Sequence, residues 1–377
     1  MKTTVERKGL LNALSVAFKA ISSKSPLPIL THFLLEAGGG RLKISATDSD
    51  LGIETAVSAE DSEPGAFTTP AKTFMDIISL IQDDYVTIVK DEEGTECRIT
   101  TEDSSCTLMT LSPEDFPIIP RFDADPDFII TQNDLRRAVR NVLFSAASHE
   151  ETRAILTGVC LTVSEGRAEF AATDARRLAV TSVPVKTSNQ ESRSYVVPRR
   201  TLDEISKFMK ASDDDVFVGV KKSMIFFQAG DVFITSRLLE GRYPNFRQVI
   251  PESSDYRTRI GKASLSTALK LMLILSQEKN YSNLVSLVVR KDSLKLRART
   301  QDLGYGAKEI PCSFTGDPEF TVSFNGQFIL DVLANMDSEE IIVELTNSEF
   351  PGVFRSAEDE SHVCVVMPLK ISDGFDS

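Results

Sequence analysis

The stretch "LKISATDSDLGIETAV" (residues 42–57) decides the fold, because a second version of it, "AEFAATDARRLAVTSV", returns at residues 168–183. In both versions, two runs of alternating apolar and polar residues flank a polar break at Thr-Asp. A period of two on either side of a turn signal is typical of a β-hairpin. A third version, "LKLRARTQDLGYGAKEI" at residues 294–310, breaks at Thr-Gln-Asp. The sequence therefore predicts three related hairpins in one chain.

The match continues downstream of each hairpin and keeps its register. Each hairpin is followed by a segment that predicts a strand running into a helix, at residues 65–81, 193–209 and 319–336. Three landmarks recur at nearly one spacing: 126 residues for Asp48 and Asp174, 128 for Pro70 and Pro198, and 127 for the aromatic-proline pairs that begin at Phe116 and Tyr243. A chance resemblance would not hold this register, so the chain is interpreted as a threefold repeat.

Each repeat also opens with an amphipathic helix. Six helices are predicted in total, at residues 5–21, 71–82, 132–147, 199–210, 262–276 and 325–336. The fold class is therefore α+β, with three repeated domains that each pack two helices on antiparallel sheets. We expect these domains at residues 1–120, 127–251 and 255–371, with linkers rich in proline and acid between them and a C-terminal tail at 372–377.

Length and composition agree with several domains. A chain of 377 residues exceeds what one hydrophobic core usually organises, and 41% hydrophobic with 26% charged residues is ordinary for a soluble globular protein. The N-terminus carries charges where a signal peptide needs an apolar run, and the most apolar window, residues 269–275, is too short to span a bilayer. We expect a cytoplasmic protein with no membrane contact. The five cysteines are scattered and never spaced C-x-x-C, so they are interpreted as small apolar residues in strands.

The charge of the chain is unevenly distributed. The whole chain carries −13 and the six predicted helices carry +7, so everything else carries −20. Arg137 and Arg140 lie opposite the apolar face of their helix, and Arg200 and Lys207 do the same on theirs. Basic faces on repeated helices suit a protein that lines a polyanion and contacts phosphates without reading sequence. The alternative, for any single helix, is an ordinary solvated surface.

The sequence contains no recognisable pattern of catalytic residues. It lacks the phosphate-binding G-x-x-x-x-G-K-[ST] loop, and the G-Y-G at Gly304 lacks the third glycine of a dinucleotide site. His149 and Glu150 begin like the H-E-x-x-H motif of a zinc protease, but Arg153 stands where the second histidine belongs. The acidic run at residues 213–215 occupies a predicted turn. We expect no catalytic residues, no metal site and no cofactor.

The repeats and their motifs resemble one known family. The segments "LPIL" from Leu27, "ATDARRLAV", "GRYPNFRQVIP", "FNGQFILDVL" and the terminal "VVMPLK" are similar, in that order, to the bacterial DNA polymerase III β subunit, the replicative sliding clamp. The resemblance covers residues 1–370. It implies the DNA-clamp fold and a head-to-tail ring dimer, with helices lining a central hole that holds double-stranded DNA. It also implies a nonenzymatic processivity factor whose partners are the polymerase III catalytic subunit, the clamp loader and other clamp-motif proteins of replication and repair.

In this family, the hairpin that corresponds to residues 172–180 helps to form a groove for short peptide motifs. Carried over position by position, the groove consists of Arg153, Leu156, Thr173, Ala175, Arg176, Arg177, Leu178, Pro244, Val249, Asn325, Phe328, Val365, Val366, Met367, Pro368 and Leu369. A pocket of this kind accepts Leu or Phe anchors, and Met367 adapts to several partners. Alternative interpretations are that Leu156, Val249 and Val365 are ordinary core residues, and that Arg177 pairs with Asp174 to hold the turn.

Further residues are assigned to two other surfaces. We expect the DNA-facing side chains to be Lys24, which matches a basic family position, together with Arg137, Arg140, His149, Arg200 and Lys207. The resemblance places the subunit interface at Cys106 and Leu108 on an edge strand of the first repeat, and at Ile274 and Leu275 on a helix of the third. An edge strand that pairs across subunits is protected from aggregation. The alternative for these four residues is an ordinary core contact.

Two features depart from the family pattern. Ala175 and Arg176 stand where the family usually has glycine and then histidine or an aromatic residue, so we expect an altered peptide preference. The chain also continues past "VVMPLK" as "ISDGFDS". One hypothesis is that Phe375 partly occupies the groove as a tethered competitor, so that deletion of residues 372–377 tightens peptide binding. Two other functions are considered: a duplicate clamp or clamp-like adaptor, for example an inhibitor-tolerant copy, and an enzyme with an unrecognised active site.

Overall fold

The computed structural model describes residues 1–22, 27–91, 94–122, 124–148, 153–187, 191–276, 283–300 and 303–369. Two of the predicted DNA-facing residues, Lys24 and His149, lie outside these ranges, as does the C-terminal tail with Phe375.

The described structure follows one order of elements three times: a strand, a helix, four strands, a helix and three strands. The first repeat contains β1 (Lys2–Glu6), α1 (Arg7–Ala17), β2 (His32–Gly38), β3 (Arg41–Thr47), β4 (Leu51–Glu63), β5 (Gly65–Pro70), α2 (Ala71–Leu80), β6 (Tyr85–Lys90), β7 (Glu96–Thr100) and β8 (Ser105–Met109). The second contains β9 (Phe128–Thr131), α3 (Gln132–Leu143), β10 (Gly158–Ser164), β11 (Arg167–Thr173), β12 (Arg177–Pro184), β13 (Arg193–Pro198), α4 (Arg199–Phe208), β14 (Asp215–Lys221), β15 (Met224–Ala229) and β16 (Val232–Arg237). The third contains β17 (Tyr256–Gly261), α5 (Lys262–Ile274), β18 (Leu284–Arg290), β19 (Ser293–Thr300), β20 (Gly304–Pro311), β21 (Glu319–Asn325), α6 (Gly326–Ala334), β22 (Glu340–Leu345), β23 (Gly352–Ser356) and β24 (Val363–Val366).

Each of the six helices begins and ends inside its predicted range, and the predicted apolar faces are buried. On α3, Leu135, Val139 and Val142 are at most 1% exposed, and on α4 the same holds for Leu202 and Ile205. Four of the five cysteines lie in strands as expected, whereas Cys312 follows the end of β20 and is half-buried.

The strand order within the sheets also repeats. The first repeat has the orders β8-β7-β6-β1 and β4-β3-β2-β5, and the other two repeats follow the same two orders with their own strands. All of the pairings between these strands are antiparallel. The sequence prediction of three related α+β domains is thereby confirmed.

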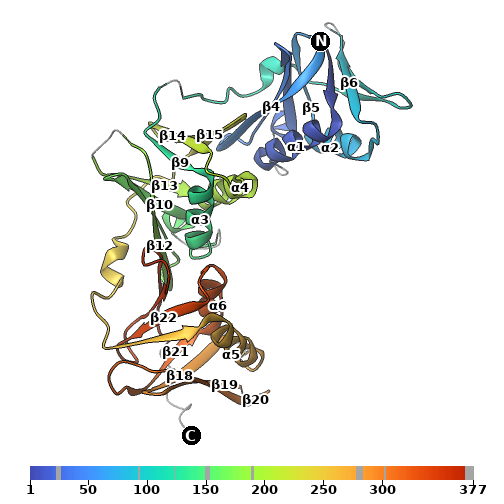
Figure 1. The fold of residues 1–377 in the computed structure, drawn as a ribbon. Coiled ribbons are helices and arrows are strands. Elements are labelled where there is room, and N and C mark those ends of the chain that lie inside the picture. Colours follow the sequence, from blue (N-terminus) through green and yellow to red (C-terminus); the bar gives the residue numbers. More distant parts are fainter. Residues whose placement is uncertain are drawn as a thin grey trace. The chain divides into compact units, whose positions relative to one another are not determined.

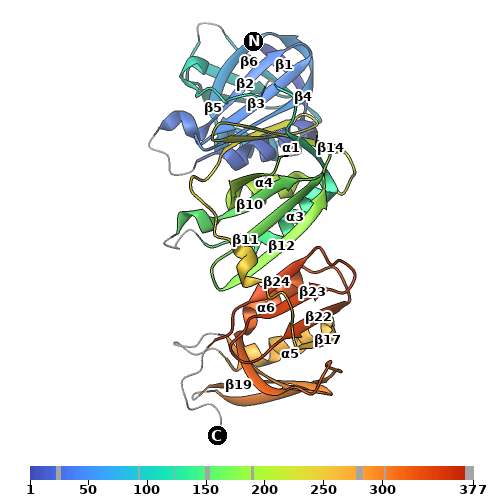
Figure 2. The ribbon, with the colours of Figure 1, turned by 90° about the vertical axis from the view of Figure 1, so that its left-hand side faces the viewer.

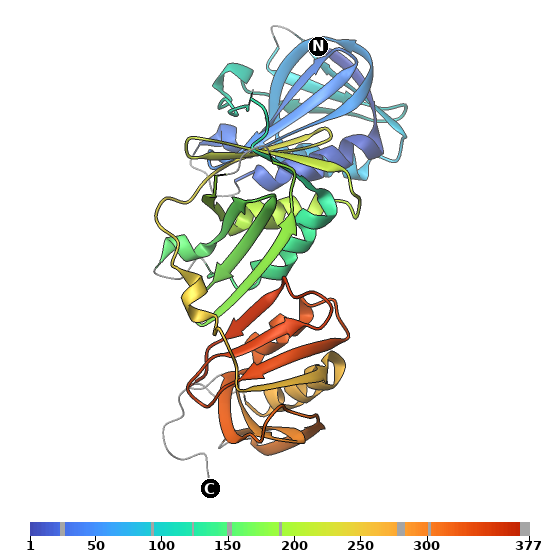
Figure 3. The same cartoon turned by 60° about the vertical axis from the view of Figure 1, so that its left-hand side comes forward.

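Two pairings join one repeat to the next. In the first seam, β16 pairs with β4, with Thr235 opposite Gly52 (Figure 3). In the second seam, β24 pairs with β12, with Val365 opposite Leu178 (Figure 2). In both cases the strand that follows the Thr-Asp turn of one repeat receives the last strand of the next repeat. The two seams are therefore copies of one arrangement.

The described residues group into two compact units by their contacts. One comprises Met1–Asn133, Val185–Asn189 and Glu204–Leu238, and the other comprises Asp134–Pro184, Gln190–Asp203 and Leu239–Ser377. The first unit holds the first seam, and the second unit holds the second seam. The division runs through the middle repeat, so the domain limits 1–120, 127–251 and 255–371 stay predictions.

Helices cover one face of a sheet in each unit. In the first unit, α1 and α2 lie side by side against the strands β2 to β5, and in the second unit α5 and α6 lie together against β18 to β21 (Figure 1). Leu42 and Ile44 on β3 are completely buried toward α1, and Phe324 on β21 is completely buried in the corresponding core. The opposite faces of the sheets are left for the linkers between repeats.

Candidate functional site

The turn between β11 and β12 is built by the side chains of its first two residues. The Thr173 hydroxyl accepts a hydrogen bond from the amide of Ala175 (3.0 Å) and donates one to the carbonyl of Arg177 (2.6 Å). The Asp174 carboxylate accepts from the amides of Arg176 and Arg177, both at 2.9 Å. Asp and Thr side chains hold turns in this way because they replace backbone hydrogen bonds that a tight turn cannot make.

Arg177 ties this turn to the third repeat. Its guanidinium is only 13% exposed and forms ion pairs with Asp174 (3.0 Å) and with Asp331 on α6 (2.5 Å). The same guanidinium lies over the Phe328 ring, 4.4 Å from its centre, and 5.7 Å from that of Phe144. The turn-holding role that was considered for Arg177 is therefore present, and the residue also connects the hairpin to α6.

The linker after β16 packs over the second seam. The hydroxyl of Tyr243 accepts from the amide of Thr173 (3.1 Å) and donates to the carbonyl of Gly158 (3.5 Å). Burial raises the pKa of Tyr243, so the phenol keeps the proton that it donates. Farther along the linker, Arg247 forms an ion pair with Glu169 on β11 at 2.6 Å. These contacts hold the linker over an apolar cluster in the seam.

A cavity of about 190 Å³ opens between this linker, the turn and the end of β24. Its walls are mainly apolar: Leu156, Leu178 and Val365 are each less than 5% exposed and form its floor, whereas Val249 (43%) and Met367 (39%) stand open at its rim. The lining residues are Arg153, Leu156, Thr173, Ala175, Arg177, Leu178, Pro244, Asn245, Phe246, Val249, Val365 and Met367. Ten of the predicted groove residues thus surround one cavity, and Val249 is not an ordinary core residue.

The other six predicted groove residues lie beside the cavity. Met367 donates its amide to the carbonyl of Arg176 (2.9 Å), and Leu369 donates to Ser323 (2.7 Å). Asn325 caps α6 by accepting from the amide of Gln327. The remaining three are Phe328, under Arg177, the buried Val366, opposite Arg177 in the strand pair, and the half-buried Pro368. A role of these residues in peptide binding stays a prediction.

The sequence-based assignment missed two lining residues, Asn245 and Phe246. Both lie in the segment "GRYPNFRQVIP", between Pro244 and Val249, which were assigned to the groove. Phe246 packs edge-on against Tyr243, with ring centres 6.4 Å apart. The sequence did contain a signal for Phe246, because this aromatic residue lies in a short linker between two residues that were assigned to the groove.

The predicted DNA-facing residues on α3 and α4 carry acidic neighbours. Arg137 pairs with Asp134 at 2.9 Å, Lys207 pairs with Glu204 at 3.1 Å, and Arg140 pairs with Asp337. The side chains of the three cations are 41%, 47% and 44% exposed. Arg200 is also exposed. Of their acidic partners, Asp337 is 70% exposed, whereas Asp134 and Glu204 are only 19% and 15% exposed, so only the Arg140 pair is an exposed ion pair that contributes little to stability.

The predicted interface residues lie on two elements with exposed surface. Cys106 and Leu108 are half-buried on β8, which is the last strand of its sheet. Ile274, at the end of α5, is 64% exposed, and Leu275 is half-buried. The exposure of Ile274 does not fit an ordinary core contact.

Comparison with known proteins identifies the family. Residues 1–120, 129–245 and 247–370 match the models of the N-terminal, central and C-terminal domains of the DNA polymerase III beta subunit. The chain belongs to the DNA polymerase III β-subunit family. The three matched segments follow the three repeats of the structure.

Relatives of this family resemble the chain over nearly its whole length. The proteins named beta sliding clamp from Synechocystis sp. and from Escherichia coli are each 30% identical to it, over 98% of this chain and 100% of theirs. The crystal structure of the DNA polymerase III subunit beta from Pseudomonas aeruginosa superposes with a TM-score of 0.92 at 28% identity, over 98% of this chain and 100% of that one. The sliding clamp of Bacillus subtilis gives 0.93 at 25% identity, over 99% and 100%. The DNA-clamp fold follows from these matches.

The described residues contain neither a metal-binding cluster nor a membrane-spanning helix. No group of three or more His, Cys, Asp or Glu residues is placed to hold a metal ion in the described part of the chain. No helix there is long and apolar enough to cross a membrane.

Proposed function

We propose that the chain is a sliding clamp: two copies close head to tail around duplex DNA and tether DNA polymerase III through the groove of the second seam. The single observation that carries the proposal is the pattern of strand partners. The strand after the turn receives the last strand of the next repeat at β4 and at β12. The corresponding strand of the third repeat, β20, has only β19 beside it among the described residues, and β8, the last strand of the first repeat, has only β7.

A second copy of the chain supplies both missing partners. If β8 of one copy pairs with β20 of the other as β16 pairs with β4, each repeat is joined to the next and the ring closes after six repeats. The exposed apolar residues at these edges support this closure, since Met109 on β8 is 60% exposed and Tyr305 on β20 is 85% exposed. Cys106, Leu108, Ile274 and Leu275 are proposed to lie in this interface.

Contact with DNA is proposed to occur through phosphates and not through bases. The six predicted helix ranges carry a net charge of +7 in a chain of −13, and the side chains of Arg137 and Lys207 are 41% and 47% exposed. Such contacts are weak and independent of sequence, which permits sliding. The acidic remainder of the surface discourages nonspecific adhesion to nucleic acid. Retention on DNA then comes from topology and not from affinity.

The groove is proposed to bind peptide motifs of the polymerase III catalytic subunit, of the clamp loader and of other replication and repair proteins. Its apolar floor accepts one or two aliphatic or aromatic anchors, each of which contributes roughly 1.5 to 3 kcal/mol on burial. Affinity of this size allows partners to exchange. We propose no catalytic activity for the chain. Its proposed localisation is the cytoplasm. The full-length match to relatives named beta sliding clamp supports this function over that of an adaptor.

Retention on circular DNA tests the proposal. The protein is loaded on a nicked circular plasmid with a clamp loader, washed in high salt, and the plasmid is then linearised. We expect the protein to survive the wash and to leave once the DNA has ends, because phosphate contacts alone weaken steeply with salt. Loss in the salt wash from intact circles would show surface binding and would contradict encirclement.

A further inference from the structure

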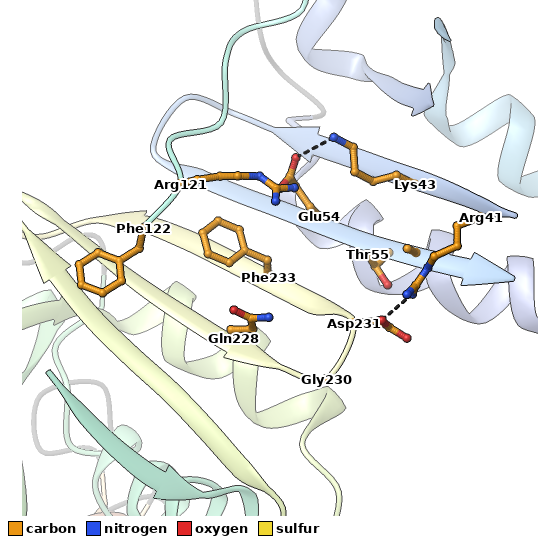
Figure 4. Close-up of a pocket in the computed structure, with 11 residues that line it drawn as sticks. Arg41, Lys43, Glu54, Thr55, Arg121, Phe122, Gln228, Gly230, Asp231 and Phe233 are labelled. Carbon is orange, nitrogen blue, oxygen red and sulfur yellow. Dashed lines mark hydrogen bonds and ion pairs between the residues drawn. The ribbon is translucent and has the colours of Figure 1, made fainter. Parts of the chain in front are cut away.

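A second cavity lies at the first seam, at the part of the β3–β4 hairpin that is remote from its turn (residues 47–51). It is a cavity of about 270 Å³ between β3 and β4 on one side and β15 and β16 on the other. Three of the side chains that line it are cations, Arg41, Lys43 and Arg121 (Figure 4). Burial alternates along β3, so Lys43 faces away from the helices, on the opposite side from Leu42 and Ile44. The cavity is therefore on the face that the proposed DNA contact leaves free.

Two of the three cations, Lys43 and Arg121, are held in place by a buried carboxylate. The Glu54 side chain is only 9% exposed, accepts hydrogen bonds from Ser45 (3.3 Å) and Arg121 (2.5 Å), and forms an ion pair with Lys43 (3.5 Å). Lys43 also pairs with Glu36 at 2.5 Å. A buried charge is costly unless it is paired and hydrogen-bonded, and this one is both.

The second seam has no such carboxylate. The repeat spacing of 126 residues puts Val180 where the first seam has Glu54, and Ala171 where it has Ser45. Counted over the whole residue, Glu54 and Val180 are both 7% exposed, so the two positions are equally buried. Packing of the seam therefore does not require a carboxylate, and its effect here is to fix two cations at the mouth of a cavity.

Arg121 and Arg41 have N–H groups beyond those that their ion pairs use. The Arg121 side chain is 56% exposed and its guanidinium also lies over the Phe233 ring, 5.7 Å from its centre. Arg41 is 49% exposed and pairs with Asp231 at 2.5 Å. A guanidinium has five N–H groups, so each arginine keeps donors for a further carboxylate.

An apolar cavity of about 260 Å³ adjoins the charged one and shares Phe122, Gln228 and Phe233 with it. Its wall includes Phe217, which is 42% exposed. Phe122 reaches this wall only because residue 219 is glycine, since a Cβ at Gly219 would lie 2.4 Å from the ring. The linker is thus packed to leave an aromatic hollow beside a cationic one.

We propose that the two cavities form a second peptide site, which binds a partner segment carrying an aromatic or aliphatic side chain next to aspartate or glutamate. The apolar side chain fills the aromatic cavity, and the carboxylate pairs with Arg121, which lies over the shared Phe233 ring. The charged residues that line the first cavity are three cations and two acids, Glu54 and Asp231, so they carry one net positive charge in a chain of net charge −13. A single carboxylate matches this charge, whereas a polyanion would be repelled by Glu54 and Asp231.

Fluorescence anisotropy with the full-length protein tests this site. The probe is a labelled octapeptide with one aspartate, Gly-Ser-Asn-Phe-Asp-Leu-Ser-Gly, and two matched probes replace its aspartate by asparagine or its phenylalanine and leucine by alanine. Arg121→Gln removes a cation, and Phe217→Ser alters the aromatic wall without touching an ion pair. Phe350→Ser changes an exposed phenylalanine (50%) elsewhere and is the matched control. Thermal melting checks that every variant is folded.

We expect Arg121→Gln, Phe217→Ser and each altered probe to weaken binding by about tenfold or more, and Phe350→Ser to leave it unchanged. Since the groove of the second seam also accepts apolar anchors, Val249→Asp at its rim shows which site is measured. Loss of binding in Val249→Asp but not in Phe217→Ser would place the peptide in the groove and overturn the proposal. Equal binding of the alanine probe, with competition by hexametaphosphate, would mean an anion site alone and would also overturn it.

Discussion

The first and second seams share their turn and strand pairing but differ in what covers them. Thr47 donates to the carbonyl of Leu51 (3.0 Å) and accepts from Ser49 (3.0 Å), and Asp48 accepts from Asp50 (3.1 Å) and Leu51 (2.8 Å). These are the hydrogen bonds that Thr173 and Asp174 make in the second seam. The repeated Thr-Asp is thus explained by turn geometry, and the turn alone does not make a groove.

The linkers account for the groove. In the first seam, a Cβ at Gly52 would lie 3.0 Å from a methyl group of Ile119, which is itself only 9% exposed, so the linker closes the surface. In the second seam, Leu178 replaces the glycine, and the linker residue Val249 is 43% exposed at the rim of the groove. Phe116 to Pro120 spans five residues, whereas Tyr243 to Pro251 spans nine. A linker longer by four residues stands away from the seam and leaves room for a ligand.

The largest expected effect comes from placing the first seam's carboxylate in the second. Val180→Glu should cost about 3 to 5 kcal/mol in the free energy of unfolding, because Glu169 stands there in place of Lys43 and the linker arginine, Arg247, is already paired with Glu169. The reciprocal change Glu54→Val should cost less than about 1 kcal/mol, because an ion pair is replaced by apolar packing. Urea unfolding of both variants measures the difference. Equal costs would mean that the two positions are not equivalent.

A buried histidine makes the second seam sensitive to acid. His362 is 2% exposed, and burial lowers its pKa to about 4, although its ring is hydrogen-bonded to the carbonyl of Asn141 (3.0 Å) and faces Asp359, Asp337 and Arg140. Below pH 6.5 the unfolded chain takes up a proton that the folded chain accepts only near pH 4. The free energy of unfolding should therefore fall by roughly 3 kcal/mol as the pH drops through this window.

The corresponding residue of the first seam is Val232, so the control is His362→Val. Thermal unfolding between pH 7 and 4 should show a loss of stability in the parent chain that is mostly absent in this variant. The same slope with pH in both proteins would assign the acid sensitivity to other groups.

One apolar residue of each linker, Ile119 and Val249, should have opposite roles. Ile119→Ala should lower the free energy of unfolding by about 2 kcal/mol and leave peptide binding to the groove unchanged, because the side chain is buried in a closed surface. Val249→Ala should leave stability within about 0.5 kcal/mol and weaken a clamp-motif peptide by about fivefold, close to 1 kcal/mol. Calorimetric titration and urea unfolding of both variants separate the two effects, and a stability loss in Val249→Ala would mean that the rim is part of the core.

The smallest effect concerns the backbone of the two turns. Ala175 and Ser49 occupy equivalent positions with φ of 70° and 83°. Residues other than glycine adopt such a positive φ only at a cost in free energy. Ala175→Gly and Ser49→Gly should each raise the free energy of unfolding by about 0.5 kcal/mol, the strain relieved being partly offset by the greater freedom of glycine in the unfolded chain. Differential scanning calorimetry should resolve both shifts. Destabilisation by either change would show that the side chain has contacts of its own.

The repeat made most of the fold predictable. The period of two around Thr-Asp and the spacing near 126 residues identified the hairpins, and the apolar faces identified all six helices. The ion pair of Arg177 with Asp331 and the cluster around Glu54 were not predicted, because each depends on which strand of one repeat receives the next. The groove was assigned through family resemblance. Asn245 and Phe246 were not assigned to it, because their position at the groove depends on the path of the linker.

A disulfide between the two edge strands tests the central claim that one seam arrangement is used three times, twice within the chain and once between copies. The strand register of the first two seams puts Ile234 opposite Ile53 and Cys364 opposite Ala179. The same positions in β8 and β20 are Cys106 and Gly306, since Gly306 pairs with Ala298 as Ile53 pairs with Ala46. In the variant Gly306→Cys, we expect mild oxidation to join two chains, because facing strand residues meet the geometry of a disulfide. Non-reducing electrophoresis should show twice the mass of one chain, and Cys106→Ser in the same variant should abolish the band. A chain that stays single after oxidation, or a crosslink that persists without Cys106, would contradict the account.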